Sequence, residues 1–268
     1  MTAARRAPGS GPRPITSPDV RGLEVAPTDD ITAACIAFEA GQLLLSLRER
    51  PDSAVSADVR SNELIVARLR QSFPGDAVLS EEAPDSAERL AAARTWIVDP
   101  LDGTREYGEP GREDWAVHVA LVVGHELRAG AVALPASGML FSTSAPLPTR
   151  LRREGPPRLA VSRTRPPPVA AAVAAALGAE LVPLGSAGAK TMAVVRGEVD
   201  AYLHAGGQYE WDSAAPVAVA VANGLHASRV DGSELRWNQP SPWLPDLLVC
   251  RPELAPRLLD ALASVGAS

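Results

Sequence analysis

The segment from residue 96 to residue 107, Trp-Ile-Val-Asp-Pro-Leu-Asp-Gly-Thr-Arg-Glu-Tyr, constrains the fold more than any other part of the chain. Its apolar start predicts a buried strand that ends directly at Asp99, so this carboxylate lies at a sheet edge. Pro100 stiffens the following turn because its ring fixes φ. Gly103 lets a ligand approach its backbone N–H closely, and a helix that began at Thr104 would favour an anion there. The segment predicts a carboxylate site for hard cations beside a cradle for phosphate.

Acidic residues elsewhere in the chain are candidates for the same site. The acidic segments are Asp58, Glu81 with Glu82, Asp99 with Asp102, and Asp212. If they converge, each like-charge pair about 4 Å apart costs roughly 4 kcal/mol at an effective dielectric near 20. Either their pKa values rise or cations fill the site. No His or Cys lies close to these acids in the sequence, so the donors are hard oxygens, which select Mg²⁺ or Mn²⁺ over Zn²⁺.

Each acid also has an ordinary interpretation when it is taken alone. Asp58 and Glu81 are then surface charges, and Asp212 is a helix N-cap, a common place for aspartate. The unit formed by Asp99, Asp102 and Thr104 has no such simple alternative.

Composition narrows the class of protein. The chain has 268 residues, 46% of them hydrophobic, and a net charge of -6. This predicts a globular protein with a substantial core, in one large domain or two lobes. The absence of a basic stripe excludes a nucleic-acid polymer as partner, whereas a small phosphate ester remains compatible because a metal supplies local positive charge. Two cysteines and no apolar signal or membrane-length segment favour a cytoplasmic enzyme without disulfides.

Hydrophobic periodicity and turn signals divide the chain into three parts. Residues 1–26 are rich in Pro, Gly, Ser and Arg and predict a disordered tail, followed by an α+β lobe over 27–145. The lobe over 146–268 alternates strands and helices. The predicted helices are 30–49, with Cys35 buried on its apolar face, 58–71, 167–176, 187–196, 212–222 and 253–264. The predicted strands are 77–80, 95–98, 115–123, 129–134, 139–143, 159–162, 181–184, 200–203 and 247–250.

Four segments together point to a family: Leu79–Glu82, Trp96–Thr104, Gly185–Lys190 and Trp211–Pro216. The chain resembles the lithium-sensitive, Mg²⁺-dependent phosphatase superfamily of inositol monophosphatases, fructose-1,6-bisphosphatases and bisphosphate nucleotidases. The segments occur in the family's order, and the resemblance covers roughly residues 30–250. The amino-acid sequence around Asp99 is most similar to that of the 3'(2'),5'-bisphosphate nucleotidase branch, particularly its actinobacterial members. The resemblance implies a two-lobed, layered αβαβα sandwich with the site between the lobes.

The resemblance also implies a role for each site residue. Glu81 and Asp99, with the Leu101 carbonyl, would bind one metal ion, and Asp99, Asp102 and Asp212 would bind another, with two or three Mg²⁺ per site and Mn²⁺ as a substitute. Asp58, Glu81 and Thr104 would orient and activate the attacking water. The residues that would contact the substrate are Asp102, Gly103, Thr104, Ser186, Lys190, His204 and Asp212.

The substrate is the more open part of the prediction. Lys190, the only lysine in the chain, is in register with a lysine that contacts the distal phosphate in related nucleotidases, although a solvated surface lysine is an alternative. His204 stands where inositol phosphatases tend to have an acid and some nucleotidases an arginine, and it is either a hydrogen-bond donor or a plain loop histidine.

The first hypothesis is hydrolysis of adenosine 3',5'-bisphosphate to AMP and phosphate, with its sulfated analogue as a second substrate, in sulfur assimilation. An inositol-1-phosphate, fructose-1,6-bisphosphate or broad-specificity phosphatase is the second. A catalytically silent nucleotide- or metal-binding regulator is the third. The chain is expected to act as a monomer or a homodimer.

Overall fold

The computed structural model describes residues 28–49, 54–148 and 155–266. The predicted tail, 1–26, lies outside the described residues. The first half contains α1 (Asp29–Arg48), α2 (Ala54–Ser72), β1 (Ala77–Ser80), η1 (Ala87–Ala91), β2 (Arg94–Asp102), α3 (Thr104–Gly108), β3 (Ala116–Val123), β4 (Glu126–Leu134), η2 (Pro135–Ser137) and β5 (Met139–Ser142). The second half contains β6 (Arg158–Ser162), α4 (Pro168–Leu177), β7 (Glu180–Leu184), α5 (Ala187–Val195), β8 (Ala201–Tyr209), α6 (Glu210–Ala222), β9 (His226–Ser228), β10 (Trp243–Cys250), η3 (Pro252–Leu254) and α7 (Ala255–Ser264).

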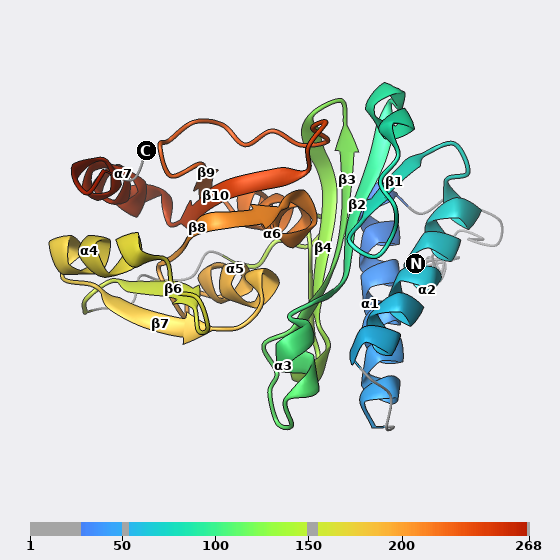
Figure 1. Cartoon of the computed structure of the whole chain (residues 1–268), viewed down its shortest axis with the longest axis horizontal. Helices are drawn as coiled ribbons and strands as arrows, with labels where there is room; N and C mark the ends of the chain where they lie inside the picture. The colour runs from blue at the N-terminus through green and yellow to red at the C-terminus, as the bar shows by residue number, and fades with distance from the viewer. Residues whose placement is uncertain (1–27, 50–53, 149–154, 267–268) are drawn as a thin grey trace, which may run out of the picture.

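These elements stack as alternating layers of helices and sheets (Figure 1). The first sheet has the strand order β1-β2-β3-β4-β5, and the second has the order β7-β6-β8-β10-β9. Helices α1 and α2 cover the outer face of the first sheet, α5 and α6 lie between the sheets, and α4 and α7 cover the outer face of the second. The predicted αβαβα sandwich is confirmed. The division into lobes at residue 145 stays a prediction.

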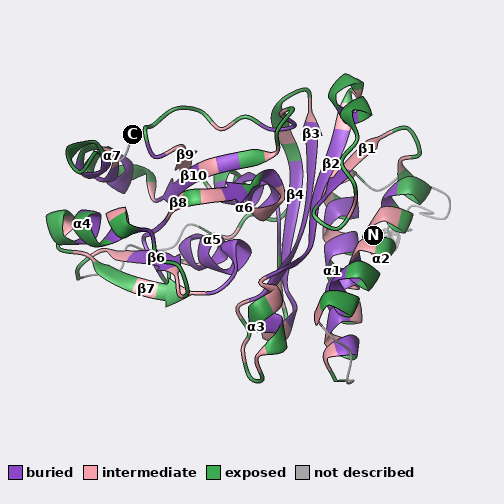
Figure 2. Cartoon of the chain, viewed as in Figure 1, coloured by how far each residue is buried: buried purple, intermediate pink, exposed green. Residues whose placement is uncertain are grey.

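Strand β2 shows why the sequence around Trp96 is apolar without interruption. Trp96 and Val98 pack into the cluster under α1 and α2, and Ile97 packs into the cluster between the sheets. Alternate side chains of a strand point to opposite faces, and both faces of this strand are covered (Figure 2). A continuous apolar run is the result.

Helix α1 contacts the first sheet with a different face from the predicted one. Cys35 is exposed, and Phe38 is 51% exposed, so the prediction of a buried Cys35 was wrong. The buried face consists of Thr32, Ala33, Ile36, Ala37, Ala40, Gly41, Leu44 and Leu47. Small residues on this face let the helix lie close to strands β3 and β4. By length and composition α1 could cross a membrane, but here it is a packed helix of the core.

Most predicted elements of the second half are present with different ends. Strand β8 continues to Tyr209 and α6 begins at Glu210, whereas the sequence predicted a strand ending at residue 203 and a helix from residue 212. Strand β9 was not predicted. In the first half of the chain, helix α2 begins at Ala54, four residues before the predicted start at 58. The extension of β8 matters because it brings Tyr209 beside Trp243 of β10.

Candidate active site

A β-bulge in β2 turns two aspartates toward the same side of the sheet. Asp99 pairs with His118 and Asp102 with Ala116, so three steps along β2 match two steps along β3. In a regular strand, residues three apart point to opposite faces. One extra residue, at Pro100–Leu101, restores the phase, so both carboxylates face α6 and Leu101 packs on the α1 side. The backbone N–H of Leu101 donates to Asp99 Oδ1 at 3.0 Å and helps to hold the bulge.

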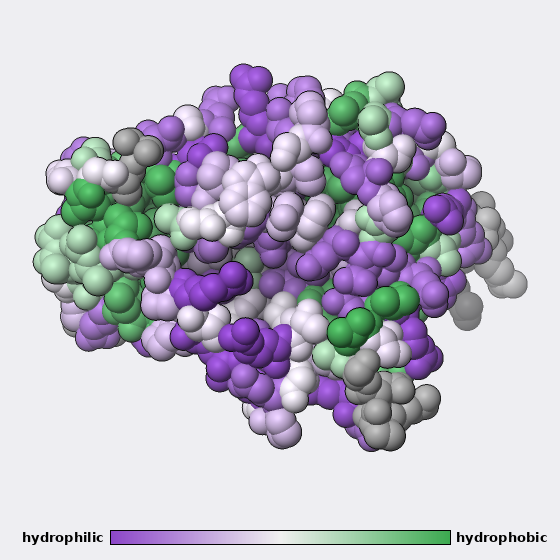
Figure 3. Space-filling view, in the orientation of Figure 1, coloured by the Kyte–Doolittle hydropathy of each residue, from purple (hydrophilic) through white to green (hydrophobic). Residues whose placement is uncertain are grey.

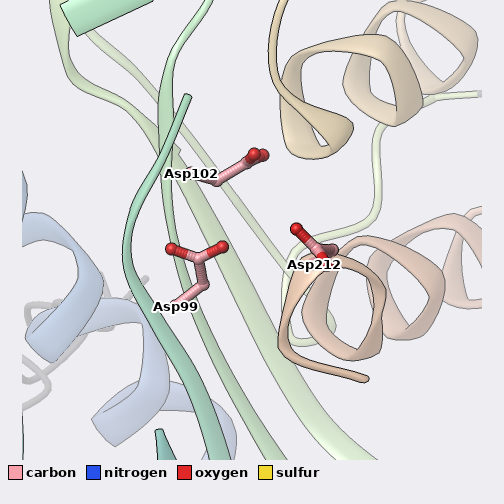
Figure 4. Close-up of side chains that lie close together, drawn as sticks. All are labelled: Asp99, Asp102 and Asp212. Carbon is pink, nitrogen blue, oxygen red and sulfur yellow. The ribbon is translucent and has the colours of Figure 1, made fainter. Parts of the chain in front are cut away.

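Helix α6 completes a cluster of three carboxylates. Oxygens of Asp99, Asp102 and Asp212 all lie within 4.8 Å of one another, and the side chains point toward a common centre (Figure 4). Asp99 Oδ2 is buried and has no hydrogen-bond partner among the described residues. Burial, then the charges of Glu81, Asp102 and Asp212, raise the pKa of Asp99 well above its ordinary value. A hard divalent cation would satisfy this oxygen and neutralise the repulsion, so the donor set fits Mg²⁺ or Mn²⁺.

The structure brings Asp58, Glu81 and Thr104 to the same place. The hydroxyl of Thr104 lies 3.5 Å from Asp58 Oδ2 and 3.3 Å from the Leu101 carbonyl oxygen. Burial, followed by the charges of Glu82 and Glu81, raises the pKa of Asp58 to about 8. The surrounding protein keeps water from much of the Glu81 carboxyl, and this burial, followed by the charges of Asp212 and Asp102, raises the pKa of Glu81 to about 7. The residue nevertheless remains exposed at the cavity, which it lines.

Asp212 serves both the cluster and its own helix. Its Oδ2 accepts a hydrogen bond of 2.6 Å from the backbone N–H of Tyr209, the N-cap of α6. The interpretation of Asp212 as the N-cap itself was therefore wrong, because it is the third residue of the helix. Burial first, then the charge of Asp102, raise the pKa of Asp212 to about 6. A carboxylate that caps a helix in this way is fixed in position and still presents an oxygen to the cluster.

Asp102 is held by the N-terminus of α5. Its carboxylate accepts hydrogen bonds from the Ser186 hydroxyl at 2.5 Å, from Ala187 N at 3.2 Å and from Gly188 N at 2.7 Å. The free N–H groups of a helix start favour an anion in this way. Gly103 lies against the turn at Ser186, because a Cβ on Gly103 would be 3.1 Å from Ser186 Cβ. Its φ of 89° is also one that glycine adopts without strain.

His118 is a site residue that the sequence did not single out. It is fully buried on β3, with Nδ1 3.0 Å from the Trp211 carbonyl oxygen and Nε2 3.2 Å from Asp102 Oδ2. Burial alone would lower its pKa, but the charge of Asp102 outweighs this and raises it. Burial likewise raises the pKa of Asp102, yet the charge of His118, whose Nε2 is 3.2 Å away, lowers it to about 2. A lone histidine in an apolar strand gives no sequence signal for this role.

Lys190 is not a surface lysine. It is 5% exposed, and its Nζ donates to the carbonyl oxygens of Gly185 at 3.1 Å and Ser186 at 2.5 Å, above the Tyr202 ring. Burial lowers its pKa to about 8, although neighbouring carboxylates such as Asp102 oppose this. The alternative of a solvated lysine is therefore wrong. The ammonium group stabilises the turn at Ser186, a residue with the unusual φ of 44°.

A cavity of about 480 Å³ lies beside the carboxylate cluster. Glu81, Asp102 and Asp212 line it, and so do Lys190 and His204. His204 Nε2 is 2.9 Å from the Gly207 carbonyl oxygen, and burial lowers its pKa. The face of the molecule in Figure 3 has a central hollow that is bordered mainly by hydrophilic side chains. The cavity size suits a small ligand with 70–90% of its surface buried, as in typical binding pockets.

Residues 46–266 match the sequence profile of the inositol monophosphatase family. The chain belongs to this family. Among solved structures, an inositol monophosphatase from Staphylococcus aureus has a TM-score of 0.73 at 19% identity, and the match covers 85% of this chain and 93% of that one. CysQ from Bacteroides thetaiotaomicron, a bacterial family member, has a TM-score of 0.71 at 26% identity, covering 86% of this chain and 99% of that one.

Members of the family from mycobacteria are much more similar in sequence. A protein of Mycobacterium leprae named 3'-phosphoadenosine 5'-phosphate phosphatase is 49% identical, and the match covers 94% of this chain and 99% of that one. A protein of the same name from Mycobacterium tuberculosis is 52% identical over 84% of this chain and 90% of its own. The Escherichia coli 3'(2'),5'-bisphosphate nucleotidase CysQ is 29% identical over 67% of this chain and 77% of its own.

Proposed function

We propose that this protein is a Mg²⁺-dependent phosphatase that removes the 3'-phosphate of adenosine 3',5'-bisphosphate, giving AMP and inorganic phosphate. The convergence of Asp99, Asp102 and Asp212 within 4.8 Å, with Asp102 and Asp212 lining the cavity, carries the proposal of metal-dependent phosphate ester hydrolysis. Similarity to the mycobacterial relatives, over most of both chains, supports the choice of ester.

The acidic groups have the chemistry to hold the cations. Glu81 and Asp99 with the Leu101 carbonyl would hold one Mg²⁺, and Asp99 with Asp102 and Asp212 would hold a second. Bound Mg²⁺ would activate the water nucleophile and stabilise charge on the phosphate and leaving oxygens. Mn²⁺ has the same preference for oxygen donors and would substitute.

The chain's own residues position the water and the phosphate. Thr104 lies within reach of Asp58 and of the Leu101 carbonyl, so its hydroxyl can donate to one of them and accept a hydrogen bond from water. Asp58, with its raised pKa, is suited to take up a proton near neutral pH. The backbone N–H groups of Gly103 and Thr104, at the start of α3, are the donors for the phosphate oxygens.

The remaining predictions about the substrate concern Ser186, Lys190 and His204. All three line the cavity, and the cation at Lys190 favours a substrate with a second phosphate. The sulfated analogue of the bisphosphate would be a second substrate. Removal of the bisphosphate by-product would support sulfur assimilation. A cytoplasmic location and a monomeric or homodimeric state stay predictions from the sequence.

A kinetic panel tests the proposal. The ratio kcat/KM is measured with Mg²⁺ for adenosine 3',5'-bisphosphate, inositol-1-phosphate and fructose-1,6-bisphosphate. We expect the nucleotide to be preferred by more than about tenfold, a difference of roughly 1.4 kcal/mol in transition-state binding. A smaller preference would reject a nucleotide specialist. No phosphate release from any of the three would favour the catalytically silent binding protein.

A further inference from the structure

Part of the cavity wall is aromatic and has no role in holding metal. Tyr209 and Trp243 are paired across strands β8 and β10, with ring centroids 5.4 Å apart and ring planes at 82°. Tyr209 also stacks on Trp211, with centroids 4.6 Å apart and planes at 10°. All three line the same cavity as Asp212. The cavity therefore has an acidic part and an aromatic part.

The indole of Trp243 is fixed on the wall and remains open to the cavity. A Cβ placed on Gly207 would lie 1.8 Å from two atoms of the six-membered ring, so the indole occupies the space that a side chain at this position would need. Gly207 also has a φ of 91°, which glycine adopts without strain. Trp243 is nevertheless 49% exposed. A large ring supported on one side and left open on another offers a preformed surface for a flat ligand.

The aromatic and acidic parts are close enough to contact one small ligand. Tyr209, which contacts both Trp243 and Trp211, donates its backbone N–H to Asp212 at 2.6 Å. One residue thus joins the aromatic wall to the carboxylate cluster. The cavity volume of about 480 Å³ is in the range that holds a nucleotide-sized molecule.

We propose that Trp243 determines specificity by stacking on the nucleobase of the substrate. This inference rests on the proposed function and deepens it. Every nucleobase has a planar π face that stacks on an aromatic side chain, whereas a cyclitol ring or a free phosphate has none. Trp243 therefore adds affinity for a nucleotide and leaves the affinity for phosphate unchanged.

The test compares three variants with the wild-type protein. W243L removes the aromatic face and keeps an apolar side chain, and W243F retains an aromatic ring. F38L is the control, because Phe38 is 51% exposed on α1, outside this cavity. For each protein, the KM for adenosine 3',5'-bisphosphate and the inhibition constant of inorganic phosphate are measured. Binding of adenosine 5'-phosphate is followed separately by quenching of tryptophan fluorescence.

We expect W243L to raise the KM for the nucleotide about tenfold, in keeping with the loss of one base–aromatic stack. The inhibition constant of phosphate should change less than about twofold in W243L. W243F should restore most of the nucleotide affinity, F38L should behave as the wild type, and the fluorescence quenching should be lost in W243F.

Two results would overturn the role of Trp243. One is a nucleotide KM in W243L within about twofold of the wild type, and the other is an equal increase in the phosphate inhibition constant. If the wild type releases no phosphate from the nucleotide, the proposed function fails instead. Quenching by adenosine 5'-phosphate that disappears in W243F would still support base stacking in that case, and no quenching in the wild type would reject it.

Discussion

Replacing Asp99 by asparagine is expected to stabilise the metal-free protein while abolishing its response to Mg²⁺. Asp99 is 1% exposed, and its carboxylate lies within 4.8 Å of those of Asp102 and Asp212. At that separation a like-charge pair costs about 3.5 kcal/mol at an effective dielectric of 20. Proton uptake relieves part of this repulsion, so we expect D99N to stabilise the metal-free fold by about 2 to 3 kcal/mol at pH 8, or about 5 to 10 °C in Tm.

The size of this stabilisation depends on pH. Burial and neighbouring charges raise the pKa of Asp99 well above its ordinary value, that of Asp58 to about 8 and that of Asp212 to about 6. Carboxyl groups with raised pKa values bind more protons in the folded state, so their stabilisation is complete below about pH 4 and is lost as the pH rises to about 8. D99N should therefore gain little at pH 5 and most at pH 8.

Scanning calorimetry at both pH values, in EDTA and in excess Mg²⁺, measures this effect. The wild-type Tm should rise with Mg²⁺ at pH 8, the D99N Tm should not, and the kcat of D99N should fall by orders of magnitude. D260N, at an exposed acid on α7, is the matched control and should change none of these. Equal destabilisation of metal-free D99N at pH 5 and pH 8, or near-normal turnover, would remove Asp99 from the metal site.

Three further substitutions test how the site is supported. G188A places a Cβ 2.2 Å from His118 Nε2, so the free energy of unfolding, measured with urea, should fall by about 1 to 3 kcal/mol although alanine has the better helix propensity. An unchanged free energy of unfolding would mean that the His118 side chain shifts at no cost. R89A removes a buried guanidinium that donates to Asn238 and other groups, so the free energy of unfolding should fall by about 3 to 5 kcal/mol. The control R68A removes an exposed arginine and should lower the free energy of unfolding by at most about 1 kcal/mol. K190A should raise the KM for the bisphosphate nucleotide more than that for inositol-1-phosphate; an equal change would limit the residue to supporting the turn at Ser186.

The acid cluster was predictable because its residues are in recognisable segments. The strand before Asp99 was also predictable, since a run covered on both faces is apolar throughout. The buried face of α1 was not predictable, because apolar residues occur on all sides of this helix. The face that packs against the sheet is the one with small residues such as Ala33 and Ala37. His118 and Trp243 were missed for another reason: each depends on strand pairings between distant segments, which local periodicity does not report.

The bulge at Pro100–Leu101 makes the length of the chain between Asp99 and Asp102 as important as its composition. Deleting one residue there would preserve every charged group and return the strand to a regular alternation. The two aspartates would then be two residues apart and would still point to the same side of the sheet, but the irregular backbone that places the Leu101 carbonyl oxygen 3.3 Å from the Thr104 hydroxyl would be lost. A one-codon deletion would thus keep both carboxylates on the cation-binding face of β2 and remove the backbone oxygen that lies beside them.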